Sequence, residues 1–487
     1  MSQILCSYKV TLISLIKISN SVHRIQKVFP IFIDMKAIKI IILSLFVVPA
    51  TWAQQDALQF KQFSSEILWN GKCYSDLKEL CKGIGNRLSG SPAAAKAVAW
   101  GLNKMKEAGA DTAYLQPVLV PHWVRGKEQL QLEFATNKFE TVPMLSLGNS
   151  QGTNGKLLHA KIIMVHNFAE FEQLDSTRIK GAIVFFNYKF KQDLVNTFEG
   201  YGDAGQYRWK SPSMASEKQA AAVIIRSIST GADDYPHTGA MGYRNAKAIP
   251  AIAIGNETAD RLEKELAIRS VEAKLISNCK IVDTVLSYNV IGELKGTTYP
   301  KQIITFGGHL DSWDVGEGAH DDGAGCVQSI EVIRTLKQQH IKPLHTIRAV
   351  LFMNEENGLR GGNAYADSLV ARKEQAIFAM ESDAGGFSPR GIGFEMNDSL
   401  KAICKSWKPL FEPYNIYDFD KEEGGADISP LKKLNTPLAG LLPDPQRYFD
   451  VHHTNKDVFE EVSHRELKMG AFAMTAFIYM VDQHLFK

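Results

Sequence analysis

The sequence has no tract that would mark a disordered or nucleic-acid-binding protein. Charged residues make up 22% of the 487 residues and hydrophobic residues 45%, a balance at which chains bury a core. The first 53 positions hold six of the 55 basic residues and one of the 53 acidic residues, which leaves 49 against 52 and a balance of −3. Nucleic-acid binding needs clustered Lys and Arg on a basic domain. The composition therefore predicts a globular protein without a nucleic-acid partner.

Cysteine is scarce, and no two of the six cysteines stand in a CxxC spacing. Cys6 falls in the N-terminal segment, and the odd number that remains indicates neither a disulfide scaffold nor a cysteine zinc site. A Cys73–Cys81 bridge would be compatible with an exported protein. The patterns at Asn256 and Asn397 fit N-glycosylation, which would apply only in a eukaryotic secretory host.

The N-terminal apolar run, residues 40–48, is too short to cross a membrane, which takes about 20 residues. It follows the basic flank Met35-Lys-Ala-Ile-Lys39 and leads to small residues that end at Ala53, the order of a signal peptide; a buried core helix is the alternative. We therefore expect a leader over 1–53, with the signal peptide starting at Met35. The mature chain would be extracellular, lysosomal or periplasmic, with no stable membrane span. Residues 1–34 would be an upstream extension or a misassigned start.

Beyond the leader, the sequence begins with helices and then changes character. Residues 57–108 are predicted to be helical, with Ser91-Pro92 opening one helix. From about residue 142 short buried strands are separated by turn residues, and a Gly/Tyr/Ser-rich stretch covers 199–216. The expected elements here are strands at 161–165, 181–186, 223–226 and 249–255 and a helix at 258–266. We infer a β-rich insert over 142–283 that folds as its own unit.

From residue 287 onward strands and helices alternate, which is typical of a mainly parallel sheet covered by helices on both faces. The apolar strands are 303–309, 346–353 and 376–381, and the helices are 324–339, 360–373, 400–411 and 464–486. We therefore predict an α/β fold with a mainly parallel mixed sheet. Because 487 residues are too many for one ordinary core, the catalytic domain would comprise 54–141 and 284–487, interrupted by the insert.

Five groups of acidic and histidine residues stand where these strands end or in loops able to reach the same edge. They are Gly308-His-Leu-Asp-Ser-Trp-Asp314, Ala319-His-Asp-Asp-Gly-Ala-Gly325, Asn354-Glu-Glu-Asn357, Glu381-Ser-Asp383 and Tyr448-Phe-Asp-Val-His-His453. In open α/β sheets ligands bind outside the carboxyl ends of the strands, so one crevice could receive all five groups.

Taken singly, such groups are usually solvated loop acids or packed core histidines. Their common position after apolar strands, where an unpaired charge is costly, favours a metal site instead. Zinc takes a few nitrogen and oxygen ligands at about 2.0–2.2 Å, and two ions about 3.5–4 Å apart can share a bridging carboxylate and a water. The residue types therefore suit a two-zinc site.

The same segments resemble the co-catalytic zinc peptidases of the aminopeptidase and glutamate carboxypeptidase group, from about residue 58 to the C-terminus. The resemblance implies a zinc aminopeptidase/phosphorylase-hydrolase-like fold. It also implies that the insert, with Pro236-His-Thr-Gly239 and Ile249-Pro-Ala251, is a protease-associated domain. Two Zn²⁺ ions per chain are implied, with the ligands divided as follows: His309 and Asp383 on one ion, Glu356 and His453 on the other, and Asp321 bridging both.

The resemblance assigns roles to the neighbours of these ligands as well. Glu355 is implied as the general base, and Asp311 as a residue that orients His309 without binding the metal itself. His452 is left as a supporting or packing residue. The peptide bond between Asp321 and Asp322 is implied to be cis.

The expected function is an extracytoplasmic two-zinc exopeptidase that hydrolyses dipeptides or short peptides with a zinc-activated water, as a carboxypeptidase or dipeptidase, and forms a homodimer. An aminopeptidase on the same metal core stays open, because no residue in the sequence selects a free carboxylate over a free amino group. A non-catalytic binding module and a one-zinc glutaminyl cyclase are the remaining alternatives. The complete ligand set counts against both.

Overall fold

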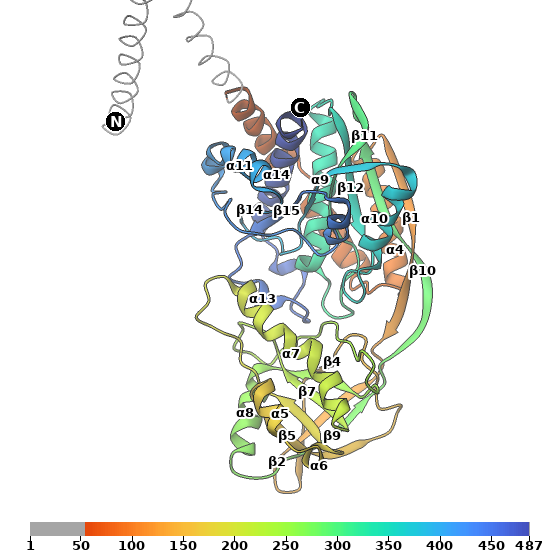
Figure 1. The fold of residues 1–487 in the computed structure, drawn as a ribbon, viewed down its shortest axis with the longest axis vertical. Coiled ribbons are helices and arrows are strands. Elements are labelled where there is room, and N and C mark those ends of the chain that lie inside the picture. Colours follow the sequence, from red (N-terminus) through yellow and green to blue (C-terminus); the bar gives the residue numbers. More distant parts are fainter. Residues whose placement is uncertain (1–53, 487) are drawn as a thin grey trace, which may run out of the picture. The chain divides into compact units, whose positions relative to one another are not determined.

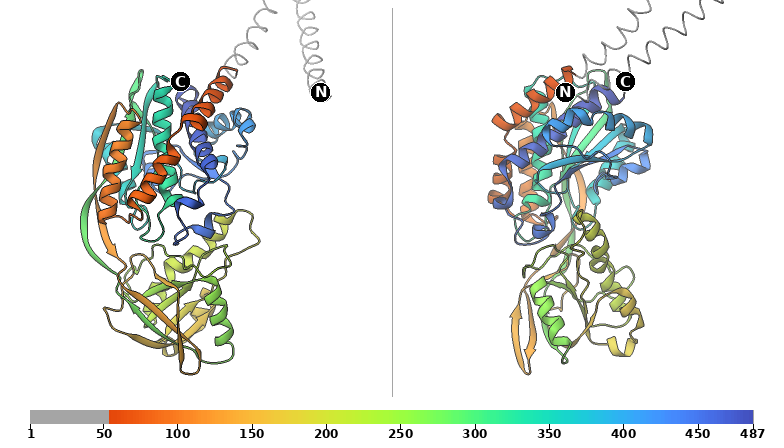
Figure 2. Two further views of the ribbon diagram at one scale, coloured as in Figure 1. Left: turned by 180° about the vertical axis from the view of Figure 1, so that it is seen from behind. Right: turned by 90° about the vertical axis from the view of Figure 1, so that its left-hand side faces the viewer.

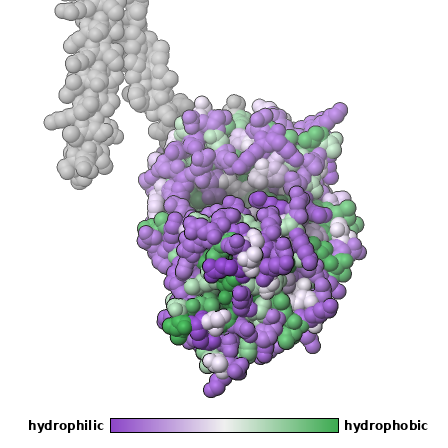
Figure 3. All heavy atoms as spheres, turned by 60° about the horizontal axis from the view of Figure 1, so that its bottom comes forward, coloured by the Kyte–Doolittle hydropathy of each residue, from purple (hydrophilic) through white to green (hydrophobic). Residues whose placement is uncertain are grey.

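The structure is a computed structural model of the chain and describes residues 54–486. The expected leader, residues 1–53, lies outside the described residues. Among the helices that are described, none has both the length and the apolar character needed to cross a bilayer. Polar residues cover most of the face in Figure 3, where apolar side chains lie in small groups.

The first sheet has seven strands in the order β1-β10-β12-β11-β13-β15-β14 (Figure 1). Its central strands β12, β11, β13 and β15 are parallel, whereas β1, β10 and β14 each run antiparallel to a neighbour. The sheet is therefore mixed, and the expectation of a mainly parallel sheet holds only for its centre. The strands are β1 (Thr112–Val124), β10 (Lys280–Leu294), β11 (Tyr299–His309), β12 (His345–Phe352), β13 (Gln375–Glu381), β14 (Pro389–Glu395) and β15 (Leu438–Pro443).

Helices cover both faces of this sheet, as the alternation predicted (Figure 2). A helix over residues 54–70 starts the described chain. One face carries α3 (Cys73–Glu79), α4 (Pro92–Glu107), α9 (Ala324–Gln338) and α14 (His464–Met480), and the other carries α10 (Arg360–Arg372) and η4 (Ser429–Leu434). The apolar faces of α9 and α14 meet in the largest buried cluster.

The expected helix over 400–411 is interrupted. It divides into α11 (Asp398–Ser406) and α12 (Lys408–Phe411). Pro409 stands in the first turn of α12, where its missing N–H cannot continue the hydrogen bonds of α11. The other short helical segments are η1 (Leu80–Ile84), η2 (Ala319–Gly323), η3 (Glu412–Tyr414), α13 (Tyr448–Val451), η5 (Phe459–Glu461) and η6 (Val481–Leu485).

The second sheet has eight strands in the order β3-β2-β9-β5-β6-β7-β8-β4, of which β5, β6, β7 and β8 are parallel. The strands are β2 (Glu128–Ala135), β3 (Lys138–Val142), β4 (Met144–Ser146), β5 (Leu158–Val165), β6 (Ile183–Phe186), β7 (Ala222–Arg226), β8 (Ala251–Ile254) and β9 (Glu272–Ser277). One face packs against α5 (Phe168–Gln173), α6 (Ser176–Ile179) and α7 (Thr197–Glu217), and the other against α8 (Asn256–Leu266).

Two features of this second unit differ from the sequence pattern. Its sheet begins with β2 at Glu128, before the expected boundary at 142, because β2 and β3 form a hairpin that pairs with β9. The Gly/Tyr/Ser-rich stretch forms the 21-residue helix α7, with Pro212 inside it. Packing on β6 and β7 outweighs the weak helix preference of glycine and serine there.

The structure also decides two local chemical questions. Cys73 and Cys81 are buried free thiols, so the bridge between them is absent. They lie on one helical run, and eight residues at 1.5 Å each separate them by about 12 Å, beyond the reach of about 7 Å for a disulfide. The side chain of Asn256 is buried and donates to the carbonyl of Gly231, whereas Asn397 is exposed. Of the two glycosylation patterns, only the one at Asn397 is accessible.

Candidate metal centre

The ends of three neighbouring parallel strands bring the expected residues together. His309 is the last residue of β11, Glu355 and Glu356 follow the end of β12, and Asp383 follows the end of β13. Since β11 pairs with both β12 and β13, their carboxyl ends meet at one edge. Asp321 reaches this edge from η2, directly before α9.

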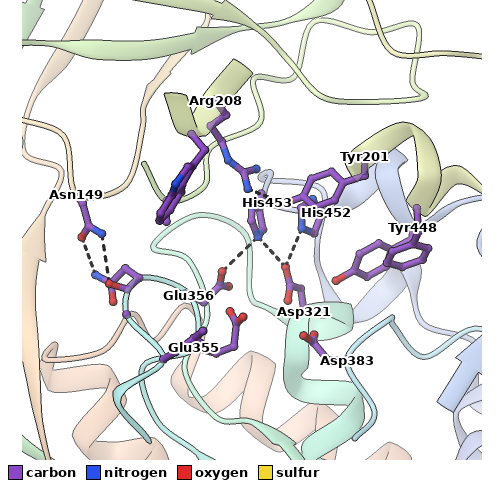
Figure 4. Close-up of a pocket in the computed structure, with 16 residues that line it drawn as sticks. Asn149, Tyr201, Arg208, Asp321, Glu355, Glu356, Asp383, Tyr448, His452 and His453 are labelled. Atoms are coloured by element: carbon purple, nitrogen blue, oxygen red, sulfur yellow. Dashed lines mark hydrogen bonds and ion pairs between the residues drawn. The ribbon is translucent and has the colours of Figure 1, made fainter. Parts of the chain in front are cut away.

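These ends open into a cavity of about 390 Å³, which we call the main cavity (Figure 4). Five of the seven residues expected from the sequence line it: Asp321, Glu355, Glu356, Asp383 and His453. His309 is 1% exposed and lies against Asp321 and Asp383. Asp311 is fully buried and does not reach the main cavity.

Asp321 stands between the two histidines. Its Oδ1 lies 3.1 Å from Nε2 of His309, and its Oδ2 lies 3.1 Å from Nε2 of His453. The remaining acids continue this pattern on either side, with Asp383 Oδ1 at 3.3 Å from His309 Nε2 and Glu356 Oε2 at 3.2 Å from His453 Nε2. Two atoms bound at about 2.0–2.1 Å to one tetrahedral ion lie about 3.3–3.4 Å apart. The spacings therefore suit one ion on each side of Asp321.

Two carboxylate oxygens of the site lack a hydrogen-bond donor, which fits the binding of a cation. Asp321 Oδ2 and Asp383 Oδ1 are buried and lie near a histidine Nε2, but neither forms a hydrogen bond of suitable geometry in the described chain, although buried polar atoms are rarely left so. Burial is the largest influence on the pKa of Asp383 and raises it. Bound cations would compensate these buried oxygens, which are costly when charged and alone.

His309 is oriented by the main chain. Its Nδ1 lies 2.9 Å from the carbonyl oxygen of Asp311, which leaves Nε2 facing the carboxylates. The Asp311 side chain acts on a neighbouring loop, since its Oδ1 accepts from the backbone N–H groups of Asn354 at 2.6 Å and Glu355 at 3.1 Å. Asp311 therefore supports the histidine through its carbonyl and the Glu355 loop through its carboxylate.

The tandem histidines differ in their distance from the shared carboxylate. His452 Nε2 is 3.6 Å from Asp321 Oδ2, against 3.1 Å for His453. The two rings are stacked with centroids 3.5 Å apart. Asp321, His452 and His453 form one cluster of metal-capable atoms, and His309, Asp321 and Asp383 form another, so both clusters share Asp321.

Glu355 lies beside these clusters with its side chain in the main cavity (Figure 4). Burial raises the pKa of its carboxyl to about 8, and the neighbouring His309 acts in the opposite direction. Glu356 is placed differently, since its Oε1 accepts from the N–H of Trp313 at 3.0 Å while Oε2 faces His453. The two adjacent acids therefore have separate environments.

The loop that carries Asp321 is held by acids outside the expected set. The Asp321–Asp322 peptide is cis, as the resemblance implied. The Asp322 carboxylate accepts from the N–H of His309 at 3.0 Å and of Gly325 at 2.8 Å. Asp457 accepts from the N–H groups of residues 320 and 321 at 2.7 and 3.1 Å. Nothing in the sequence singled out Asp457, because its role depends on a contact across more than 130 positions.

A second group of residues at the main cavity comes from α7, which belongs to the second sheet. Phe198, Tyr201, Arg208 and Trp209 all line the main cavity. Sequence reasoning missed them, and the only signal was the mixture of aromatic residues, glycine and one arginine within a polar stretch. Tyr448, on α13, lines the same cavity.

Comparison with known proteins places this site in a family. The sequence profile of peptidase family M28 matches residues 289–478. Carboxypeptidase Q of Xenopus laevis is 33% identical over 84% of this chain and 86% of that protein. Carboxypeptidase Q of Homo sapiens is 32% identical over 84% of this chain and 85% of that protein.

Solved structures agree with this. A peptidase M28 precursor from Shewanella amazonensis matches with a TM-score of 0.84 at 31% identity, over 88% of this chain and 97% of that one. A zinc aminopeptidase from Bacillus subtilis matches with a TM-score of 0.61 at 21% identity, over 84% and 94%, a likeness that shows the fold alone. The chain therefore belongs to peptidase family M28 and is a metallopeptidase homologous to carboxypeptidase Q.

Proposed function

We propose that this metallopeptidase is a two-zinc exopeptidase that cleaves dipeptides or short peptides with a free C-terminal carboxylate. The observation that carries the two-ion site is the position of Asp321, whose two oxygens each lie 3.1 Å from a different histidine. The proposed ligands are His309 and Asp383 for one ion and Glu356 and His453 for the other, with Asp321 common to both.

The residues around the ions would divide the remaining chemistry. Two bound zinc ions would supply Lewis acidity that lowers the pKa of water and stabilises developing negative charge. Glu355, which lines the main cavity without being one of the proposed ligands, would take a proton from the attacking water and pass it to the leaving amine. Before metal binds, desolvation raises the pKa of this carboxyl above that of an exposed glutamate, which makes it the stronger base.

Arg208 supports a preference for a free carboxylate. Among the described residues that line the main cavity, it carries the single guanidinium or ammonium group, and no acidic side chain of the described chain forms an ion pair with it. Its NH2 donates to the hydroxyl of Tyr201 at 2.6 Å and its NH1 to the carbonyl of Thr238 at 3.4 Å, while its buried Nε is unpaired. Guanidinium groups bind carboxylates with charge-assisted hydrogen bonds.

Dipeptides with one blocked terminus test this preference for a free carboxylate. Dipeptides blocked by N-acetylation should still be cleaved by a carboxypeptidase, whereas C-amidated dipeptides should be cleaved slowly. Arg208→Gln should raise KM for free-carboxylate substrates by roughly 10–100-fold, the range of a lost charged hydrogen bond, and should leave C-amidated substrates nearly unchanged. Equal effects of Arg208→Gln on both substrate classes would exclude Arg208 as the carboxylate site.

One observation favours an aminopeptidase or dipeptidase as the second candidate. A smaller cavity of about 230 Å³ shares Phe198 and Asp383 with the main cavity and is also lined by Glu381 and Glu423. Lys421 lines the same cavity, but the acidic side chains outnumber it and would suit a substrate ammonium group. If N-acetylation alone abolishes cleavage, the chain is an aminopeptidase, and if either block does so, it is a dipeptidase.

Export, the protease-associated identity of the second unit and homodimer formation are further parts of this proposal. An exported chain should begin near Gln54, and N-terminal sequencing of secreted protein that found Met1 or Met35 would exclude the leader.

A homodimer would have a surface available on the β1/β10 pair, where Leu119 lies opposite Leu286 and both are more than half exposed. Light scattering of the purified protein gives the oligomeric state.

A further inference from the structure

We infer that the second unit takes part in the metal centre: the carbonyl group of Thr238 holds the ring of His453, and the Arg125–Asp314 pair keeps that carbonyl in place. The inference rests on the proposed function, because it takes His453 as a zinc ligand. Its consequence is that one of the two zinc ions depends on the second unit and the other does not.

The contact between the two residues is reciprocal. Nδ1 of His453 lies 3.2 Å from the carbonyl oxygen of Thr238, and the N–H of Thr238 donates to the carbonyl oxygen of His453 at 3.1 Å. A histidine that donates from Nδ1 presents the lone pair of Nε2, and this Nε2 is the atom that faces Asp321 and Glu356. Thr238 therefore selects both the tautomer and the direction of the ring.

The two histidines are oriented from different places. The carbonyl that holds His309 belongs to Asp311, two residues further along the same loop. The carbonyl that holds His453 lies 215 positions away in the sequence, in the segment between β7 and β8 of the second sheet. Loosening the second unit should therefore disturb the ion at His453 and spare the ion at His309.

Thr238 is itself tied to the segment that joins the sheets. It is fully buried, and its hydroxyl donates to the carbonyl of Ser146 at 2.8 Å. Arg125, between β1 and β2, donates to the same carbonyl at 2.6 Å and contacts the Thr238 hydroxyl at 3.5 Å. Arg125 also pairs with both oxygens of Asp314, at 3.0 and 2.5 Å. Asp314 follows β11 in the His309 segment, so this pair joins the second unit to the metal-bearing loops.

Close packing leaves little room for this arrangement to shift. A Cβ on Gly148 would lie 1.8 Å from the ring of Trp313, and a Cβ on Gly239 would lie 2.4 Å from Arg208 NH1. The loops around Thr238 therefore pack closely against the residues beside His453, whose ring centroid lies 5.6 Å from that of Trp313.

The test is a zinc titration of metal-free protein against a chromophoric chelator, which resolves the affinities of the two ions. Asp314→Asn and Thr238→Val should each weaken one ion by roughly 10–100-fold, the usual effect of losing support outside the ligand shell, and leave the other within about twofold. Thr238→Ser, which keeps the hydroxyl, should bind both zinc ions with the affinities of the parent protein. Cobalt substitution should show a changed visible band for one ion only.

Arg261→Gln is the matched control, because Arg261 pairs bidentately with Glu140 within the second unit, where both side chains are about half exposed. It should leave both affinities unchanged. The fold of each variant is checked by circular dichroism of the metal-free protein. The inference is overturned if folded Asp314→Asn and Thr238→Val bind both ions like the parent, or if both ions weaken equally. A parent protein that binds no zinc would instead overturn the proposed function.

Discussion

Glu355 and Glu356 are adjacent, yet only Glu356 contacts the other proposed ligands. Glu356 Oε2 lies 3.2 Å from Nε2 of His453, whereas the Glu355 side chain lines the main cavity and forms no ion pair with a proposed ligand in the described chain. Glu355→Gln should therefore keep both zinc ions and lower kcat by about 10²–10⁴-fold, since the amide cannot accept a proton. Glu356→Gln should lose zinc. Turnover together with zinc content by mass spectrometry distinguishes them, and exchanged behaviours would reverse the two assignments.

The tandem histidines allow a similar comparison. His453→Ala should lose one zinc ion and nearly all activity, because its Nε2 lies 3.1 and 3.2 Å from two proposed ligands. His452→Ala should cost less, since its nearest carboxylate oxygen is 3.6 Å away. Zinc content of the two purified variants measures the difference. Equal loss from both would mean that His452 is also a ligand.

Asp321 should be the most damaging ligand to replace. Its two oxygens serve different sides of the site, and a bridging carboxylate offsets the repulsion between two ions. Asp321→Ala should release both zinc ions, whereas Asp383→Ala should release one. If dialysed Asp321→Ala protein retained one tightly bound ion, the bridging role would be wrong.

At the scale of elements, α9 is tied to α3 by buried charges. Arg334 on α9 pairs with Asp76 at 2.7 Å and with Glu331 at 2.5 Å, and all three side chains are nearly excluded from solvent. Because α9 begins directly after η2, it also anchors the loop that carries Asp321. Helix attachment in this protein therefore uses polar contacts as well as the apolar core.

Arg334→Met should lower the free energy of unfolding by up to about 3–5 kcal/mol, because Asp76 keeps only Lys104 as a cationic partner and Glu331 keeps only backbone N–H donors. Urea denaturation of the metal-free protein measures this change. Arg261→Met removes an exposed pair and should change stability by less than about 1 kcal/mol. A similar small effect at Arg334 would show that the network relaxes around its loss.

At the scale of the whole molecule, metal removal should destabilise the fold. Four of the five proposed ligands are buried and the fifth, Asp383, is partly buried, so the metal-free state keeps carboxylates in an unfavourable environment. Free zinc at about 1,000 times its Kd should stabilise the folded chain by roughly 4 kcal/mol. Melting curves with chelator and with added zinc test this. Identical melting temperatures in both conditions would contradict a tightly bound metal.

The fold followed from the sequence where elements are local and strongly apolar. The strands at 303–309, 346–353 and 376–381 are confirmed as β11, β12 and β13, and the second of them ends one residue earlier than predicted, at Phe352. The antiparallel strands β10 and β14 and the helix α7 did not follow, because edge pairing and a Gly/Ser-rich helix depend on partners elsewhere in the chain. The Cys73–Cys81 bridge is absent for a local reason, since helical spacing separates the two thiols.

By itself the sequence indicated which acids and histidines gather at one edge of the sheet. Acids and histidines that follow apolar strands must lie at the carboxyl edge of a parallel sheet, and that rule assembles His309, Glu356 and Asp383 without any knowledge of distances. Only the tertiary structure decided which oxygen of Asp321 faces which histidine, and that Arg208 and Thr238 reach the site from the second unit. Contacts between residues so distant in the sequence leave no local pattern, because they arise only when distant parts of the chain pack together.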